Sequence, residues 1–454
     1  MRSRTLSHET GGAMKDYFLR DHKGKAYFHL PEEWEVVNLA IQKPVKADIS
    51  ISRMVTDAIS LPTGTPSLAE MVRGKKKVAI VVDDNARPTP RRALLTPLLD
   101  YLRDCGVENG QITLLIAAGT HPTPSRAEIE EAFGNELCRQ IRIVGHDCHA
   151  PDLVSVGTLK HLGELKVNPL FAEADLRISV GSILPHPLAG FGGGAKTIFP
   201  GIANYELIHN HHVALMLAPG SSTGNAAPNN GFLREIREAG RLARLDFIVN
   251  AVYDADEDIK TVVAGHFEEA HKAGIELCVK ELGVPFDRFA DVTIMSSFPY
   301  TDGPQVLKPL SASNMVTKKG GSVIVYADRI KGGQFAPSLL EIFDRAFAMA
   351  AGDPKRLVMT HIRENKPIIP GIAMDFNSAL NCTMLYVSRT RMFLVSDDAD
   401  EAQAARLGFE YASSVQKAIN RIARDVPKAT VNIMPSAAYV LPLVPESMRM
   451  TWDD

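Results

Sequence analysis

The chain has 454 residues, of which 45% are hydrophobic and 23% charged, fractions typical of globular proteins and not of disordered or low-complexity chains. This length exceeds one hydrophobic core and predicts two or three domains. The 50 basic and 53 acidic residues give a formal charge of −3, so the chain lacks the overall field that would hold nucleic acid or an anionic membrane.

The cysteines and the apolar pattern narrow the class of protein further. Five cysteines, an odd number with no C-x-x-C pair, form neither a disulfide framework nor a zinc ribbon. The first twenty residues contain no apolar signal core, and no apolar stretch approaches the roughly 18–20 residues that span a bilayer. We therefore expect a cytoplasmic protein with no membrane partner.

From the N-terminus, residues 1–70 predict a polar lead-in with one helix at 51–60. Strands and helices then alternate, which predicts a doubly wound and mostly parallel α/β sheet. The expected strands are 78–83, 111–118, 141–147 and 174–186, and the expected helices between them are 90–106 and 125–134.

Polar loops follow these strands, namely DDNARP, GTHP, GHDCH and PHPLAGFGGGAK. In open α/β sheets, ligands bind beyond the carboxyl ends of the strands. The four loops should therefore converge on one rim of the sheet. The histidines support this location, because eight of the fourteen lie between positions 121 and 212.

Further helices are expected at 204–217, 231–245 and 266–282, followed by a linker at 283–289. We place a domain boundary there, which gives an N-terminal domain at 1–282 and a C-terminal α/β domain at 283–454. The last residues are expected to pack back on the first domain. For the second domain, the pattern predicts strands at 291–297, 320–328, 384–388, 392–396 and 430–435, and helices at 307–317, 337–350 and 399–424.

The segment GFGGGAKT (190–197) imitates two phosphate-binding motifs. A Walker A loop requires glycine where Ala195 stands, and eight residues separate the segment from its strand, so it fits neither that motif nor a dinucleotide-binding turn. Glycines nevertheless let backbone amides approach an anion, and Lys196 stands at the exit of the loop. The alternative is a flexible turn with a solvated lysine.

Several residues have the chemistry and spacing of a site. His209 and His212 lie three residues apart on one helix face and form half of a metal site, or an exposed polar face. His121 and His186 each follow a strand and are candidate proton shuttles. The remaining candidates are pairs at i,i+3 with the chemistry to hold a carboxylate: Asp84 with Arg87, and Gln305 with Lys308.

Together, DDNARPTP, AAGTHPTP, GHD, the block ILPHPLAGFGGGAKTIFPGIANYELIHNHH and QVLK resemble the lactate racemase family in order and spacing. The resemblance covers roughly residues 30–440. It implies two α/β domains with mostly parallel sheets and the active site in the cleft between them. It also implies racemisation or epimerisation of a small 2-hydroxyacid with a nickel-pincer nucleotide, and therefore enzymes that supply this cofactor.

The same resemblance implies roles for individual residues. Lys196 would carry the cofactor through a covalent bond, next to Gly192, Gly193 and Gly194 and supported by Asp84. His212 would be the nickel ligand, and His121 and His186 the paired acid/base residues. Arg87 and Lys308 would hold the substrate carboxylate, with Gln305 beside them.

The chain departs from the family pattern at three places. Gly192 replaces a small hydroxyl residue, Ala86 replaces a threonine, and no tryptophan lies in the second half apart from Trp452 near the end. These changes favour a substrate that is lactate-like or larger.

Two other functions fit the residues. One is a zinc hydrolase that uses His209 and His212 with Glu206 or Asp147, and the other is a homologue that binds a nucleotide or cofactor without catalysis. The sequence does not indicate an oligomeric state.

Overall fold

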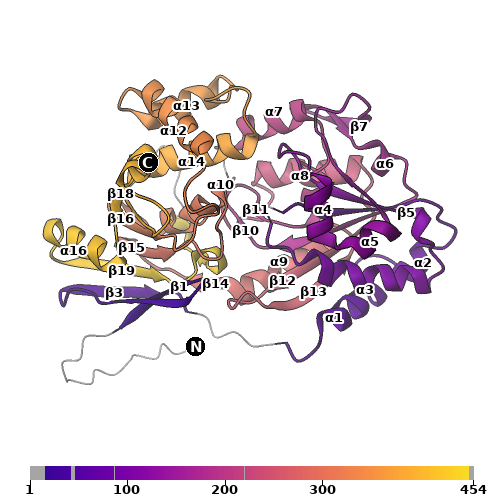
Figure 1. The fold of residues 1–454 in the computed structure, drawn as a ribbon, viewed down its shortest axis with the longest axis horizontal. Helices are drawn as coiled ribbons and strands as arrows, with labels where there is room; N and C mark the ends of the chain where they lie inside the picture. The colour runs from indigo at the N-terminus through magenta and orange to yellow at the C-terminus, as the bar shows by residue number, and fades with distance from the viewer. Residues whose placement is uncertain (1–15, 42–46, 86, 219, 449–454) are drawn as a thin grey trace.

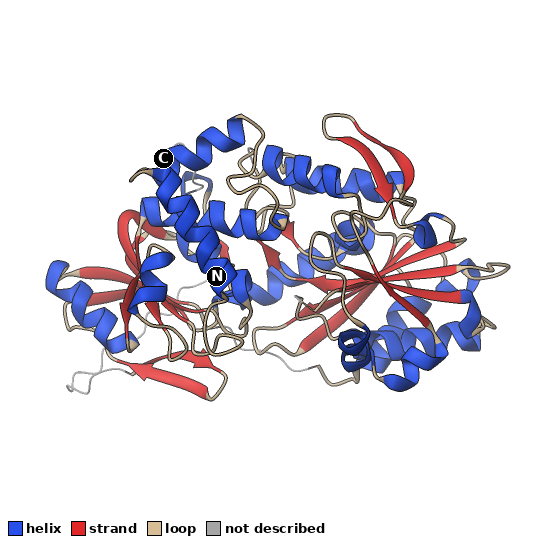
Figure 2. Cartoon of the chain, turned by 45° about the horizontal axis from the view of Figure 1, so that its top comes forward, coloured by secondary structure: helices blue, strands red, loops and turns tan. Residues whose placement is uncertain are grey.

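The computed structural model describes residues 16–41, 47–85, 87–218 and 220–448. Two six-stranded sheets lie side by side, and helices cover both faces of each (Figure 2). This arrangement confirms the predicted α/β class with mostly parallel sheets.

The first sheet has the strand order β13-β12-β9-β4-β5-β6. Five strands are parallel and only β13, at one edge, is antiparallel. The strands are β4 (Val78–Asp83), β5 (Ile112–Ala117), β6 (Arg142–Gly145), β9 (Leu176–Ile183), β12 (Phe247–Tyr253) and β13 (Ile259–Gly265).

The side chains of β4 point alternately to the two faces of this sheet, and helices cover both faces. Val78, Ile80 and Val82 pack into the core formed with α1, α3 and α9, while Ala79 and Val81 pack into the core formed with α7 and α8. A strand buried on both faces is apolar throughout, as VAIVVD is. The helices are α1 (Ile51–Ser60), α3 (Arg91–Asp104), α4 (Arg126–Phe133), α5 (Asn135–Gln140), α7 (Tyr205–Leu215), α8 (Gly231–Leu242) and α9 (Glu269–Leu282).

The second sheet has the order β18-β17-β16-β15-β19-β3, and all its strands are parallel. Its strands are β3 (Trp34–Leu39), β15 (Ala290–Ser296), β16 (Thr317–Tyr326), β17 (Arg391–Val395), β18 (Glu410–Ala412) and β19 (Ala429–Met434). One face is covered by α10 (Gly303–Leu307), α11 (Leu310–Asn314), α12 (Pro337–Ala350), α13 (Pro354–Arg363), α14 (Met374–Arg389) and α15 (Glu401–Arg406). The other face is covered by α16 (Val415–Asp425) and by the hairpin of β1 (Tyr17–Asp21) and β2 (Gly24–Phe28).

The start of the chain corrects the expected domain division. We assigned residues 1–282 to the first domain, but β3 pairs with β19 and completes the second sheet, where indigo β3 lies beside yellow β19 (Figure 1). The pairing joins segments almost 400 residues apart, which local sequence patterns do not reveal. Farther along, β14 (Gly283–Pro285) pairs with β20 (Leu441–Leu443), and Leu441 packs into the core of the first sheet.

Two helical regions also differ from expectation. Residues 384–388 were predicted as a strand but lie in α14, where Leu380 and Met384 are buried one turn apart. A short apolar run does not distinguish strand from helix. The helix expected at 307–317 is two short helices separated by Pro309. Within the described residues, no helix is both long and apolar enough to cross a membrane.

The position of β3 generates a stability prediction. Trp34 is 6% exposed, and its indole Nε1–H donates to Val426 O at 3.0 Å. We expect Trp34→Ala to lower the free energy of unfolding by about 3–5 kcal/mol, because it removes a large buried side chain. Urea denaturation followed by circular dichroism, with hydrogen exchange of the β19 amides, measures this effect. The matched control is Tyr27→Ala, whose ring is 65% exposed; equal losses in the two variants would contradict the placement of β3.

Candidate active site

The predicted site residues gather where the strand order of the first sheet reverses, between β4 and β9. Asp84 and Arg87 follow β4, His121 follows β5 and His186 follows β9. A cavity of about 70 Å³ lies at this edge. Its wall includes five of the predicted site residues, which are Asp84, Arg87, His121, Lys196 and His212. Reversal of strand order separates neighbouring loops and leaves room for a ligand.

His121 is held by Asp84. The Asp84 carboxylate and His121 Nδ1 form a short hydrogen bond, and both side chains are largely buried. The carboxylate accepts a hydrogen bond from His121 Nδ1–H, so the neutral ring has its lone pair on Nε2. In the structure the Asp84 carboxylate orients this imidazole, and the support of the cofactor by Asp84 stays a prediction.

His186 has the opposite arrangement. Its Nδ1 accepts hydrogen bonds from the backbone N–H groups of Leu188 (3.2 Å) and Ala189 (3.1 Å), so the neutral ring carries its proton on Nε2. Burial, followed by the positive charges of Lys196 and Lys308, holds the pKa of His186 well below its ordinary value. An anion bound among these cations would therefore raise the pKa of His186.

The glycine-rich segment turns tightly so that Lys196 enters the site. Gly193 and Gly194 have φ of 76° and 60°, and a Cβ on Gly194 would lie 2.7 Å from His271 Nδ1. His271 Nε2–H donates to Gly192 O at 2.8 Å, and the Gly194 amide donates to Asn250 Oδ1 at 2.8 Å. These glycines thus allow close packing against α9 and β12, and the Gly194 amide is already engaged inside the protein.

The Lys196 amine is the most perturbed group of this segment. Burial and the nearby Arg87 lower the pKa of Lys196 to about 7, while the buried Asp83 carboxylate acts in the opposite direction. Asp83 accepts a hydrogen bond from Thr89 Oγ1 at 2.6 Å, and burial raises its pKa. Near neutral pH a large share of the Lys196 amine is therefore unprotonated, which is the nucleophilic form.

His212 reaches the same cavity from α7. Its Nδ1–H donates to Ile208 O at 2.9 Å, so the neutral ring carries its lone pair on Nε2, an atom through which imidazoles bind metals. His209 is separate from it, because its ring lies near Tyr205 and its Nδ1 contacts Asn210 Oδ1 at 3.3 Å. Among the described residues no group of three or more histidine, cysteine or carboxylate side chains could hold a metal, so the zinc-hydrolase alternative gains no support.

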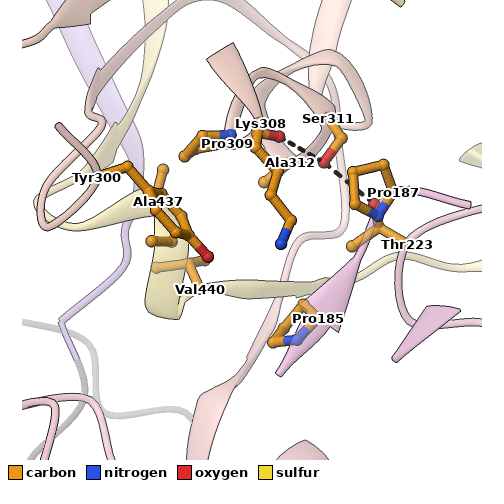
Figure 3. A pocket seen from close by; sticks show the side chains of 11 residues that line it. Pro185, Pro187, Thr223, Tyr300, Lys308, Pro309, Ser311, Ala312, Ala437 and Val440 are labelled. Carbon is orange, nitrogen blue, oxygen red and sulfur yellow. Dashed lines mark hydrogen bonds between the residues drawn. The ribbon is translucent and has the colours of Figure 1, made fainter. Parts of the chain in front are cut away.

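The second domain contributes Gln305, which lies in α10, and Lys308, which directly follows the end of that helix. Lys308 lies with Pro185 and Pro187 in a second cavity, of about 20 Å³, between the two domains (Figure 3). Burial and the charges of Arg87 and Lys196 hold the pKa of Lys308 well below its ordinary value. Gln305 Oε1 is buried without a hydrogen-bond partner, as expected of a group that awaits a ligand.

Sequence reasoning missed Tyr300, which follows β15. Its ring centroid lies 5.4 Å from Lys308 Nζ, in the same cavity (Figure 3). Burial raises the pKa of Tyr300 to about 12, so the phenol remains a neutral donor. The signal in the sequence was its position just after a strand, in SSFPYTD, which we treated only as a turn.

Arg87, Lys196 and Lys308 are basic groups that lie close together: the charge of Arg87 lowers the pKa of Lys196, and the charges of Arg87 and Lys196 lower the pKa of Lys308. Within the described part of the chain, none of these three side chains forms an ion pair with a carboxylate. Buried basic groups without partners favour an anionic ligand. The cleft is therefore suited to a carboxylate or phosphate next to two imidazoles.

Comparisons with known proteins find similarity to lactate racemases. Residues 22–224 match the family model of the lactate racemase N-terminal domain. The chain is 34% identical over 317 residues to a lactate racemase of Thermoanaerobacterium thermosaccharolyticum, covering 68% of this chain and 74% of that protein. It is 30% identical over 402 residues to a lactate racemase of Lactiplantibacillus plantarum, covering 87% and 91%. The structure of the lactate racemase apoprotein from T. thermosaccharolyticum superposes with a TM-score of 0.81 at 28% identity, covering 95% of this chain and all of that one.

The buried amine generates a prediction for the cofactor-free protein. The pKa of Lys196 is about 7 in the folded chain and near 10.5 when unfolded, so the folded state binds fewer protons and stability is lost as pH falls from about 10.5 to about 7. We expect Lys196→Met to stabilise the protein by on the order of 2–4 kcal/mol at pH 7 and by little above pH 10.5. Thermal unfolding at several pH values measures this difference.

The matched control is Lys166→Met, because that side chain is 43% exposed and its ion pair with Glu164 lies at the surface. A Lys196→Met variant that is no more stable than the control at pH 7, or equally stabilised at both pH values, would contradict the burial of the amine.

Proposed function

Because this chain belongs to the lactate racemase family, we propose that it racemises or epimerises a 2-hydroxyacid by oxidation to the 2-keto acid and re-reduction on the opposite face. The observation that carries the proposal is the convergence of His121, Lys196 and His212 on one cavity, with His186 following the neighbouring strand. The hydrogen on the hydroxyl-bearing carbon of a carboxylate is a poor acid, so its removal as hydride avoids a costly carbanion.

The proposed cofactor is a nickel-pincer nucleotide. When bound, it supplies a centre that accepts a hydride and returns it. The chain offers a buried amine of lowered pKa in Lys196 for covalent attachment and an Nε2 lone pair on His212 for nickel, and both side chains line one cavity. One protein ligand suffices if the cofactor supplies the others, which agrees with the lack of a larger ligand cluster in the described residues. We infer from the packing contacts of the loop that Gly192, Gly193 and Gly194 position Lys196.

The substrate carboxylate is proposed to bind Arg87 and Lys308. The side-chain amide of Gln305 would face the substrate through either its oxygen or its nitrogen. An anion there would restore the charged form of Lys308. His121 accepts the hydroxyl proton at Nε2 for one enantiomer, since Asp84 keeps its Nδ1 protonated. His186 serves the other enantiomer, because its pKa rises when the anion offsets the surrounding positive charge.

Such a protein depends on enzymes that make and insert the nickel cofactor, and these are its proposed partners. We also propose a cytoplasmic location, with support from five cysteines that form no disulfide.

The reaction is tested with protein loaded with cofactor by co-expression with the cofactor-making enzymes. Incubation with single enantiomers of 2-hydroxyacids in D₂O should give stereoinversion with the carbon-bound hydrogen retained. Chiral chromatography and mass spectrometry measure both quantities. Deuterium entering that carbon at the rate of inversion would contradict hydride transfer, and no inversion of any acid in the panel by loaded protein would contradict the racemase function.

The control for attachment is Lys196→Ala, which should lose both turnover and the mass of the bound cofactor in intact-protein mass spectrometry. A Lys196→Ala variant that keeps the cofactor mass would contradict covalent attachment at this amine.

Asp84 generates a second prediction, as a positioning residue that acts through His121. Asp84→Asn should lower kcat by about 10²–10⁴-fold with little change in KM, because the amide no longer favours the Nδ1-protonated ring. The acidic limb of the pH–rate profile should also shift to lower pH, since the imidazolium loses its carboxylate. The control is Asp100→Asn at the surface, where Asp100 pairs with Arg103 at 2.8 Å. A variant with lowered kcat but an unchanged pH profile would indicate only a structural role.

A further inference from the structure

The Lys196 side chain has the two features that make a lysine reactive towards carbonyl compounds. It lines the cavity of about 70 Å³ at the edge of the first sheet, where burial removes water from the amine. The positive charge of Arg87 acts in the same direction, and together they lower the pKa of Lys196 to about 7. Proteins use desolvation and a neighbouring cation to obtain the unprotonated lysine that attacks a carbonyl group. The proposed function uses this amine only to carry the cofactor.

Two further groups in the wall of the same cavity supply what such a reaction needs. Arg87 lines it too, and a guanidinium binds a carboxylate through two parallel hydrogen bonds. The His121 ring, which Asp84 orients through Nδ1, has an Nε2 lone pair that accepts and returns a proton. Because one water molecule needs roughly 10–15 Å³ of such space, the cavity holds about five waters, or one acid of about six non-hydrogen atoms.

We propose that Lys196 of the cofactor-free chain captures small 2-keto acids as a reversible imine, with the carboxylate of the acid on Arg87 and its carbonyl carbon bonded to Lys196 Nζ. The carbonyl and carboxylate of a 2-keto acid are on adjacent carbons, which suits an amine and a guanidinium that line one small cavity. This activity is separate from racemisation, because it needs neither nickel nor a hydride acceptor.

The reaction has two steps and involves no oxidation or reduction. In the first, the Nζ lone pair bonds to the carbonyl carbon, the π electrons of the carbonyl move to oxygen, and a carbinolamine results. In the second, the nitrogen lone pair forms the C=N bond and the hydroxyl leaves as water. In each step His121 Nε2 moves one proton from nitrogen to oxygen, so that amine and ketone become imine and water.

The test uses the full chain expressed without the cofactor-making enzymes, with pyruvate as the keto acid. Sodium cyanoborohydride reduces the imine to a stable secondary amine, and intact-protein mass spectrometry with peptide mapping counts and locates the adducts. The matched control is Lys166, whose side chain is 43% exposed. At pH 7 about half of the Lys196 amine is unprotonated, against less than about one part in a thousand for a solvated lysine.

Labelling should therefore be at least about tenfold faster at Lys196 than at Lys166, and it should persist to pH 7 at Lys196 alone. Lys196→Met should remove the fast adduct and leave the slow labelling of surface lysines. Equal rates at Lys196 and Lys166 in the wild-type chain would overturn the inference.

A second comparison tests the role of the carboxylate. Pyruvamide has the same shape as pyruvate but a neutral amide, so pyruvate should label Lys196 at least about tenfold faster. Arg87→Gln should reduce this preference, whereas Arg92→Gln, at an exposed position of α3, should not. Equal labelling by the two compounds in the wild-type chain would overturn the assignment of 2-keto acids.

These outcomes are independent of the proposed function. Racemisation by cofactor-loaded protein, without selective labelling of the cofactor-free chain, would overturn the imine and leave the racemase function standing. Selective labelling at Lys196 by pyruvate, with no racemisation by loaded protein, would support the imine and overturn the racemase function.

Discussion

The crowding of basic groups in a partly buried cleft is the constraint on which the site depends. Arg87, Lys196 and Lys308 come from both domains; the charge of Arg87 helps to lower the pKa of Lys196, and the charges of Arg87 and Lys196 help to lower the pKa of Lys308. Such an arrangement is unfavourable in the empty protein, and the rest of the fold must hold it in place. An anion that entered the cleft would recover free energy by favouring the charged forms of Lys196 and Lys308, which is the physical reason to expect an anionic ligand there.

The two histidines are prepared differently for the same proton chemistry. A carboxylate fixes His121, whereas two backbone amides fix His186. The protonation of His186 is therefore coupled to occupancy of the cleft by an anion, while the orientation of His121 is set by Asp84 in advance. The two imidazoles are thus oriented by different partners, a carboxylate for His121 and backbone amides for His186.

The architecture explains how groups from distant parts of the chain meet. Strand order reverses between β4 and β9 in the first sheet and between β15 and β19 in the second. Tyr300 follows β15 and the small residues Ala437 and Val440 follow β19, and all three line the cavity that Pro185 also lines. The pairing of β14 with β20 and of β3 with β19 ties the ends of the chain into this arrangement.

The sequence by itself determined the α/β class, most strands of both sheets and the family, because hydrophobic periodicity is local and the motif around Lys196 is long and specific. It also indicated His121 and His186 as candidate proton shuttles, since loops after parallel strands share one edge of the sheet. His212 was indicated by its spacing to His209 on one helix face. Only the tertiary structure decided that Asp84 contacts His121, that β3 (Trp34–Leu39) completes the second sheet and that Tyr300 lines a small cavity with Lys308. Each of these depends on contacts between segments distant in the chain, and neither the strength of a hydrogen bond nor the volume of a cavity is encoded in local spacing.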